Sequence, residues 1–386
     1  MDNVFDFRNR LINEYSSFSR SFSKVSAQDI LSKVELEYDR GRYWPEPLIQ
    51  INPNYKRQST VQQLAHEGML HASCSHIFQT GKTEGKAADL HLYVHQLQAL
   101  AKAQKQQSYV VTTGTGSGKS LAFFVPIIDR ILKAKQADPQ KRTRAIVIYP
   151  MNALANSQLE ELDKFLHGYP DDHKPFTVAR YTGQESDTDR KQIADNPPDI
   201  LLTNFMMLEL ILTRFEDVDR RVVEHCQGLE FLVLDELHTY RGRQGADVAL
   251  LVRRLRERLQ ASQLVCIGTS ATMSSTGTQA DRNQTVANVA SLLFGAQITE
   301  HDVIGETLER VTNPAKDIEA VKSLLKPALL KESYHWPDFA AFSDDPLAVW
   351  VELSLGIELP LDEPPRRAKP ITLGDAARRL SDDAQC

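Results

Sequence analysis

The sequence predicts an α/β protein in which a mostly parallel sheet is flanked by helices. From Leu92 to about Gly295, short apolar runs alternate with helical segments, the pattern of βαβ units around a buried sheet. The first 90 residues lack this alternation, and the tail from Pro360 is rich in Pro and charge, as linkers are. We therefore expect a mainly helical accessory region at 1–90, the α/β domain at 91–311 and a linker or accessory segment at 312–386.

The expected strands are the apolar runs of this alternation, each followed by a helical segment. They are residues 109–112, 145–149, 177–181, 200–203, 231–234 and 264–267.

Composition sets outer limits on function. The chain has 386 residues, 41% of them hydrophobic and 25% charged, which is ordinary for a globular protein. Its net charge of -6 provides no global positive field, so any nucleic-acid contact must come from local features. No apolar stretch is long enough for a signal peptide or a membrane span, so we expect a cytoplasmic protein without a membrane partner. The cysteines Cys74, Cys226, Cys266 and Cys386 are widely spaced, which predicts free thiols.

A glycine-rich loop, TGTGSGKS, lies between the first expected strand and an apolar helical segment. In this context backbone N–H groups surround phosphates, Lys119 reaches the β and γ oxygens, and the Ser120 hydroxyl ligates magnesium. Thr113 stands where the usual pattern has Gly. The expected ATP-binding residues of the loop are Thr113, Gly114, Thr115, Gly116, Ser117, Gly118, Lys119 and Ser120.

Two adjacent carboxylates, Asp235 and Glu236, follow the apolar run FLVL in the string DELH. Ligands gather at the carboxyl ends of parallel strands, so Asp235 is placed to hold magnesium and Glu236 to polarise the attacking water. We expect the catalytic set Lys119, Asp235, Glu236 and His238, with magnesium held by Ser120 and Asp235.

Two further segments are expected to serve the same site. The side-chain amide of Gln96, upstream of the loop, can pair with adenine through one donor and one acceptor. Downstream, small residues at the end of the last expected strand can hydrogen-bond to the acidic motif and relay the nucleotide state. These small residues are Thr269, Ser270, Ala271 and Thr272, and the last three are the expected coupling residues.

Two other clusters leave alternatives open. His71, Cys74 and His76, with the pair His91 and His95, have spacing conceivable for a metal, but they lack a second sulfur, and packing or capping roles are favoured. A group of arginines is as compatible with a solvated helix face as with a nucleic-acid surface. Its members are Arg241, Arg243, Arg253, Arg254, Arg256 and Arg258.

Gln96, TGTGSGKS, YPMNALANSQ, LLTNFMMLE, DELH and SAT occur in the order of motifs Q, I, Ia, Ib, II and III of superfamily 2 helicases. The chain more narrowly resembles the large bacterial DEAD/DEAH-box helicases of the MrfA type, which include DNA-repair helicases and phage-defence helicases such as those of Druantia systems. The resemblance implies a RecA-like lobe that binds ATP and Mg²⁺. It also implies movement on single-stranded DNA, 3′ to 5′, and other subunits of a defence or repair complex as partners.

In such motors, the segments after certain strands follow one nucleic-acid strand. The resemblance places Asn152, Ala153, Gly183, Gln184, Thr203 and Asn204 at that surface. Asn152 stands where many relatives have Arg, so one charge-assisted phosphate contact is expected to be missing.

A superfamily 2 motor needs a second RecA-like lobe to supply arginine fingers, and no matching arginine string follows SAT. We therefore expect this chain to be the first lobe of a larger motor and to hydrolyse ATP poorly alone. Two alternatives stay open: an RNA helicase, or a nucleotide-gated interaction module that does not unwind nucleic acid.

Overall fold

The computed structural model describes residues 3–22, 24–41, 44–114, 116–271, 278–331, 334–360 and 364–385. The chain divides into two compact units. We call Tyr55–Leu308 the sheet unit, and Met1–Asn54 with Glu309–Cys386 the terminal unit. In the described part of the chain, no helix is long and apolar enough to cross a membrane.

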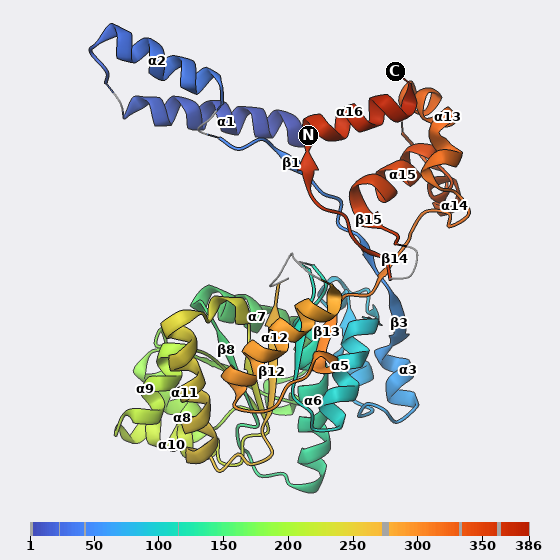
Figure 1. Ribbon diagram of the computed structural model, residues 1–386. Coiled ribbons are helices and arrows are strands. Elements are labelled where there is room, and N and C mark those ends of the chain that lie inside the picture. The colour runs from blue at the N-terminus through green and yellow to red at the C-terminus, as the bar shows by residue number, and fades with distance from the viewer. Residues whose placement is uncertain are drawn as a thin grey trace. The chain divides into compact units, whose positions relative to one another are not determined.

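The sheet unit is built on a seven-stranded sheet in which every paired strand is parallel to its neighbour (Figure 1). Its strand order is β13-β7-β12-β11-β8-β10-β9. The expected strands are all present, which confirms the α/β prediction, and β13 is an additional strand at one edge. The strands are β7 (Tyr109–Thr112), β8 (Ala145–Tyr149), β9 (Val178–Tyr181), β10 (Ile200–Asn204), β11 (Phe231–Leu234), β12 (Val265–Ser270) and β13 (Val303–Gly305).

Helices cover both faces of the sheet because successive strand residues point to opposite sides. Val111 packs into one apolar core and its neighbour Val110 into the other. The first core includes side chains of α5 (Val94–Gln104), α6 (Leu121–Ala137) and α7 (Asn152–Leu166). The second includes side chains of α8 (Asp187–Asp195), α9 (Phe205–Thr213), α10 (Asp217–His225), α11 (Gly242–Arg258) and α12 (Gln279–Phe294).

Residues 55–90 belong to the sheet unit in the contact-based division. Val61, Leu64 and Ile77 are buried in the same core as α5 and α6. The sequence-based boundary near residue 90 therefore differs from the structural one, and the functional boundaries at 90 and 311 stay predictions. The local elements are β3 (Arg57–Thr60), α3 (Val61–His66), α4 (Cys74–Ile77), β4 (Gln79–Thr80), β5 (Ala88–Asp89) and β6 (His91–Tyr93), with β3 antiparallel to β6 and β4 to β5.

The terminal unit combines the two ends of the chain. Its small core contains Leu325, Trp350 and Leu355, and the Trp350 indole N–H donates to Asp383 at 2.8 Å. The segment expected to act as a linker thus contains helices with a core of their own. The elements are α1 (Val4–Ser21), α2 (Gln28–Asp39), β1 (Leu48–Ile49), α13 (Ile318–Leu329), α14 (Phe339–Ser343), α15 (Pro346–Val351), a π-helical turn (Glu352–Gly356), β15 (Ile357–Glu358), β16 (Arg366–Arg367), β17 (Ile371–Thr372) and α16 (Leu373–Ala384).

Within this unit β1 pairs antiparallel with β17, and β15 with β16. Two further short strands, β2 (Asn54–Tyr55) and β14 (Leu308–Glu309), lie where the chain passes from one unit to the other.

Candidate functional site

The glycine-rich loop connects β7 to α6 at the carboxyl edge of the sheet. Gly116 and Gly118 have φ angles of 78° and 66°, a left-handed conformation that favours glycine. A Cβ atom on Gly118 would lie 2.7 Å from Gln96 Nε2, so a larger residue there would also displace this side chain. Thr115 lies outside the described residues. The loop therefore has the backbone shape that phosphate binding requires.

Thr113, the departure from the usual glycine, has a structural role. Its hydroxyl lies 2.6 Å from the Ser117 hydroxyl, and both side chains are buried. This hydrogen bond joins the two limbs of the loop from the inside. A glycine at position 113 could not make it.

Helix α5 holds the loop through two consecutive side chains. Gln96 Oε1 accepts from the Tyr93 N–H at 2.9 Å, and its Nε2 donates to the Gly118 carbonyl at 2.8 Å. His95 is fully buried, and its Nε2 lies 2.9 Å from the Ser117 carbonyl. The expected contact of Gln96 with adenine stays a prediction, whereas its contact with the loop is direct.

The acidic motif follows β11, as expected. Asp235 Oδ1 accepts a hydrogen bond from the Thr269 hydroxyl, which in turn accepts from the Glu236 N–H at 3.1 Å. Burial raises the pKa of Asp235 above its ordinary value, and the hydrogen bond from Thr269 opposes this effect. One threonine of β12 therefore orients both acids, in agreement with the expected hydrogen bonding of this segment to the acidic motif.

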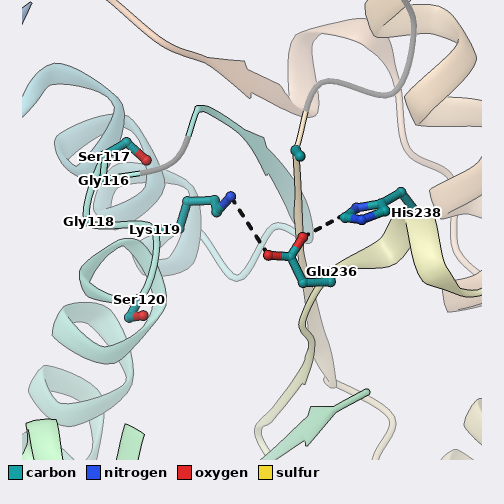
Figure 2. Close-up of a pocket in the computed structure, with 8 residues that line it drawn as sticks. Gly116, Ser117, Gly118, Lys119, Ser120, Glu236 and His238 are labelled. Carbon is teal, nitrogen blue, oxygen red and sulfur yellow. Dashed lines mark ion pairs between the residues drawn. The ribbon is translucent and has the colours of Figure 1, made fainter. Parts of the chain in front are cut away.

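Glu236 faces the phosphate loop across the cavity (Figure 2). Its Oε1 lies 3.9 Å from Lys119 Nζ, and Lys119 also donates to the Thr113 carbonyl at 3.3 Å. Glu236 has a φ of 54°, a left-handed conformation that is uncommon for a residue with a side chain and often marks functional sites. The backbone thus holds this carboxylate in a strained position that aims it at the loop.

His238 links the acidic motif to the end of β12. Its Nδ1 lies 3.2 Å from Glu236 Oε2 and 3.3 Å from the Ser270 hydroxyl, so it can donate to one of the two. Ser270 itself donates to the Ala271 carbonyl at 2.7 Å. Thr272 lies outside the described residues. The expected proximity of this segment to DELH is present, and its role in relaying nucleotide state stays a prediction.

Residues of the loop, of the DELH segment and of the end of β12 line an open cavity of about 480 Å³, a size suited to a nucleotide. The donor set fits a magnesium nucleotide, since loop N–H groups and Lys119 can meet phosphate oxygens and Ser120 and Asp235 offer oxygen ligands. In the described part of the chain, Tyr149 and Tyr240 near the acids have buried hydroxyls without a hydrogen-bond partner. The lining residues are Gly116, Ser117, Gly118, Lys119, Ser120, Glu236, His238 and Ala271.

A second group of expected residues lies at the ends of the neighbouring strands β8 and β10. Asn204 Nδ2 donates to Asn152 Oδ1 at 2.7 Å and to the Thr182 carbonyl at 3.0 Å, while its Oδ1 caps α9 through the Met207 N–H. Ala153 is exposed beside Asn152. The structure therefore brings Asn152 and Asn204 together on one edge, and their contact with nucleic acid stays a prediction.

Two expected nucleic-acid contacts do not agree with their placement. Thr203 is fully buried, and its hydroxyl donates to the Tyr181 carbonyl at 2.6 Å, because it points into the sheet. The Gly183 N–H donates to Glu185 Oε2 at 2.9 Å, so in this conformation it is not offered to a phosphate. The Gly183 and Gln184 backbone remains exposed at the loop between β9 and α8.

The two clusters left open by the sequence are now placed. His71 accepts from the Ser73 N–H at 3.1 Å through Nδ1, and Cys74 is buried in the core, which raises its thiol pKa to about 12. Among the described residues, no group of three or more His, Cys, Asp or Glu side chains could hold a metal ion. In the arginine group, Arg254 pairs with Glu209 and Arg256 donates to Cys266 Sγ at 3.3 Å.

Comparisons with known proteins give the chain its relatives. The family model described as DEAD/DEAH box helicase matches residues 93–280. The chain is 35% identical to the ATP-dependent helicase YprA of Bacillus subtilis (strain 168), over 47% of this chain and 23% of that protein. It is 26% identical to Druantia protein DruE of Escherichia coli (strain UMEA 4076-1), over 47% of this chain and 16% of that protein. The matches thus span less than a quarter of either relative.

The fold is similar to that of the DUF1998 helicase MrfA in a structure bound to DNA. The two share a TM-score of 0.51 and 23% identity, over 73% of this chain and 35% of that chain. The MrfA-type resemblance in the sequence is thereby confirmed at the level of fold.

Proposed function

Since the DEAD/DEAH box helicase family model matches residues 93–280, we propose that the chain is the ATP-binding lobe of a motor that moves on single-stranded DNA. The observation that carries the proposal is that Lys119 and Glu236 face each other across one cavity, with Asp235 directly before Glu236 and hydrogen-bonded to the same threonine. A phosphate-binding loop, a magnesium ligand and a base are the parts that ATP hydrolysis needs.

Each of these side chains has a distinct task. Lys119 and the loop N–H groups would bind the phosphates, and Ser120 and Asp235 would hold a magnesium ion, which would supply positive charge to the phosphate oxygens. Glu236 Oε1, 3.9 Å from Lys119 Nζ, is released from this pair when phosphates engage the lysine, and it then accepts a proton from the attacking water. Thr269 keeps both acids oriented.

The edge formed by Asn152 and Asn204 is the proposed nucleic-acid surface. Met151 and Met206, beside these asparagines, expose 59% and 63% of their surface. Thioether side chains can pack on deoxyribose, whereas a ribose 2′-hydroxyl at the same place would lose hydration. Their exposed apolar surface is the basis on which DNA is proposed over RNA as the strand that is bound.

The proposal includes a second RecA-like lobe. In the described part of the chain, Lys119 is the one cationic side chain that lines the cavity. Phosphoryl transfer in this class of motor draws further positive charge from arginines on the facing lobe. We expect that lobe to close the open side of the cavity when ATP and DNA are bound.

The test is ATP hydrolysis by the full-length natural protein and by the 386-residue chain, with single-stranded DNA, with RNA of the same sequence and with neither. DNA is expected to stimulate the full-length protein more than RNA does, and the chain alone is expected to respond little. Glu236→Gln should lower the stimulated rate by about a hundredfold or more, since it removes the base and keeps the side-chain shape. Glu161→Gln, an exposed change on α7, is the matched control.

Three outcomes would contradict parts of the proposal. Equal or greater stimulation by RNA would make the chain part of an RNA helicase. A robust DNA-stimulated rate from the chain alone, abolished by Glu236→Gln, would remove the need for a second lobe. Nucleotide-dependent partner binding without any nucleic-acid stimulation would favour a nucleotide-gated interaction module.

A further inference from the structure

The phosphate loop is held from outside its cavity by three side chains that are distant in sequence. His95 and Gln96 meet the carbonyls of Ser117 and Gly118, as described above. The third is Glu306, whose Oε2 accepts a hydrogen bond from the Gly114 N–H at 3.0 Å. Glu306 belongs to none of the helicase motifs recognised in the sequence.

Strand register explains why Glu306 reaches the loop. β13 pairs parallel with β7, and Gly305 lies beside Thr112. Both strands end at the same edge, so the residue after β13 comes next to the first residues of the loop. A hydrogen bond from the Thr112 hydroxyl to the Ile304 carbonyl at 3.3 Å adds to this pairing.

The position of β13 is itself fixed by the helix that carries the other two contacts. Lys102 of α5 forms an ion pair with Asp302 at 2.6 Å, directly before β13, and both side chains are largely buried. Helix α5 thus holds the loop through His95 and Gln96 and holds the strand that delivers Glu306. The three contacts form one frame around the loop.

Glu306 forms its hydrogen bond with the loop outside the surface that phosphates would occupy. The cavity is lined by residues 116–120 of the loop, and Gly114 is not among its lining residues. A carboxylate that is hydrogen-bonded to the Gly114 N–H therefore leaves the phosphate-facing groups available. It also restrains the part of the loop that precedes them. A restrained loop loses less conformational freedom when nucleotide binds, which strengthens binding.

We propose that Glu306 is a positioning residue that preorganises the phosphate loop for the magnesium nucleotide through the Gly114 N–H. The inference rests on the proposed ATP binding at this loop. What the loop requires from residue 306 is a hydrogen-bond acceptor, and a negative charge is not needed.

The experiment compares Glu306→Ala with Glu306→Gln in the full chain. The affinity for a non-hydrolysable ATP analogue with magnesium is measured by calorimetry, and amide exchange is followed in residues 113–120. Glu306→Ala should weaken binding about tenfold, the effect of one lost hydrogen bond, and should speed exchange of the loop amides. Glu306→Gln keeps an acceptor oxygen and should restore both properties to within about twofold of the wild type. Glu300→Ala, at a carboxylate before β13 whose side chain is 41% exposed, is the control.

The outcomes separate this inference from the proposed function. If the wild-type chain does not bind the analogue, ATP binding itself is wrong. If the wild type binds and Glu306→Ala binds equally well with unchanged loop exchange, the positioning role alone is wrong. If Glu306→Gln is as defective as Glu306→Ala, the acceptor explanation is overturned in favour of a requirement for charge.

Discussion

The strands of the sheet unit and the first two helices of the terminal unit differ in what they bury. Every residue of β8 and β11 is buried, whereas α1 and α2 bury none. The strands are stabilised by apolar packing on both faces. Helix α1 is capped by Asn3, and α1 and α2 make surface contacts such as the Arg20–Asp39 ion pair at 3.3 Å.

This difference has a consequence for function. The nucleotide site requires side chains from β11, β12 and the loop after β7 to be fixed within small tolerances, and a densely packed sheet supplies that rigidity. Helices that bury nothing are expected to open locally at low free-energy cost. Substitutions in the sheet should therefore lower the stability of the whole sheet unit, whereas substitutions in α1 and α2 should affect only those helices.

The largest expected effect comes from a matched pair of Leu→Ala substitutions. Leu232 in β11 is fully buried, and its truncation should lower the free energy of unfolding by about 3 kcal/mol through lost packing and a residual cavity. Leu11 in α1 is 46% exposed, and its truncation should cost less than about 0.5 kcal/mol. Urea denaturation and hydrogen exchange of the sheet amides each measure the two losses. Equal losses of unfolding free energy in the two variants would contradict the comparison.

The same contrast explains how much of the fold the sequence could predict. Continuous apolar runs predicted β8 and β11 with their observed ends. β12 was predicted at 264–267 but extends to Ser270, because Thr269 and Ser270 are buried polar residues that carry no apolar signal. β13 was missed because three residues form it and its place is set by pairing with β7.

The candidate site shows a similar limit. Local strings predicted the loop and the acids, because their chemistry depends on residues that are adjacent in sequence. The sequence indicated that the segment starting at Thr269 bonds to the acids, but not which of its hydroxyls does so. The contact of Glu306 with Gly114 depends on strand register, which a single sequence does not reveal. The hydrogen bond from the Gly183 N–H to Glu185 was missed for another reason. A loop carboxylate can accept from backbone N–H groups of its own loop or leave them unbonded, and the sequence does not decide between the two.

A smaller effect is expected from the helix caps, because an asparagine caps a helix in each of the two regions. Asn204 caps α9 through the Met207 N–H at 2.7 Å, and Asn3 caps α1 through two N–H groups at 2.9 Å. Asn204→Ala should lower global stability by about 1 kcal/mol, because α9 buries residues in the sheet unit. Asn3→Ala should speed amide exchange in α1 and leave the urea midpoint unchanged. A shifted midpoint for Asn3→Ala would show that α1 folds cooperatively with the rest.

The smallest expected effect is a pH dependence from His95, which is buried against Tyr55 and Tyr93 beside the loop. Burial lowers the pKa of His95 from 6.5, while its hydrogen bond to Ser117 and the charge of Glu306 act in the opposite direction. As pH falls below about 6.5, the unfolded chain binds a proton before the folded chain does, so stability declines until the folded pKa is reached.

His95→Gln keeps a donor for the Ser117 carbonyl and should reduce this decline between pH 7.5 and 5.5 in urea denaturation. His301→Gln, at a histidine whose side chain is 84% exposed, is the control and should leave the decline as in the wild type. An equal decline in His95→Gln and the wild type would mean that the imidazole is protonated as readily in the folded chain as in the unfolded one.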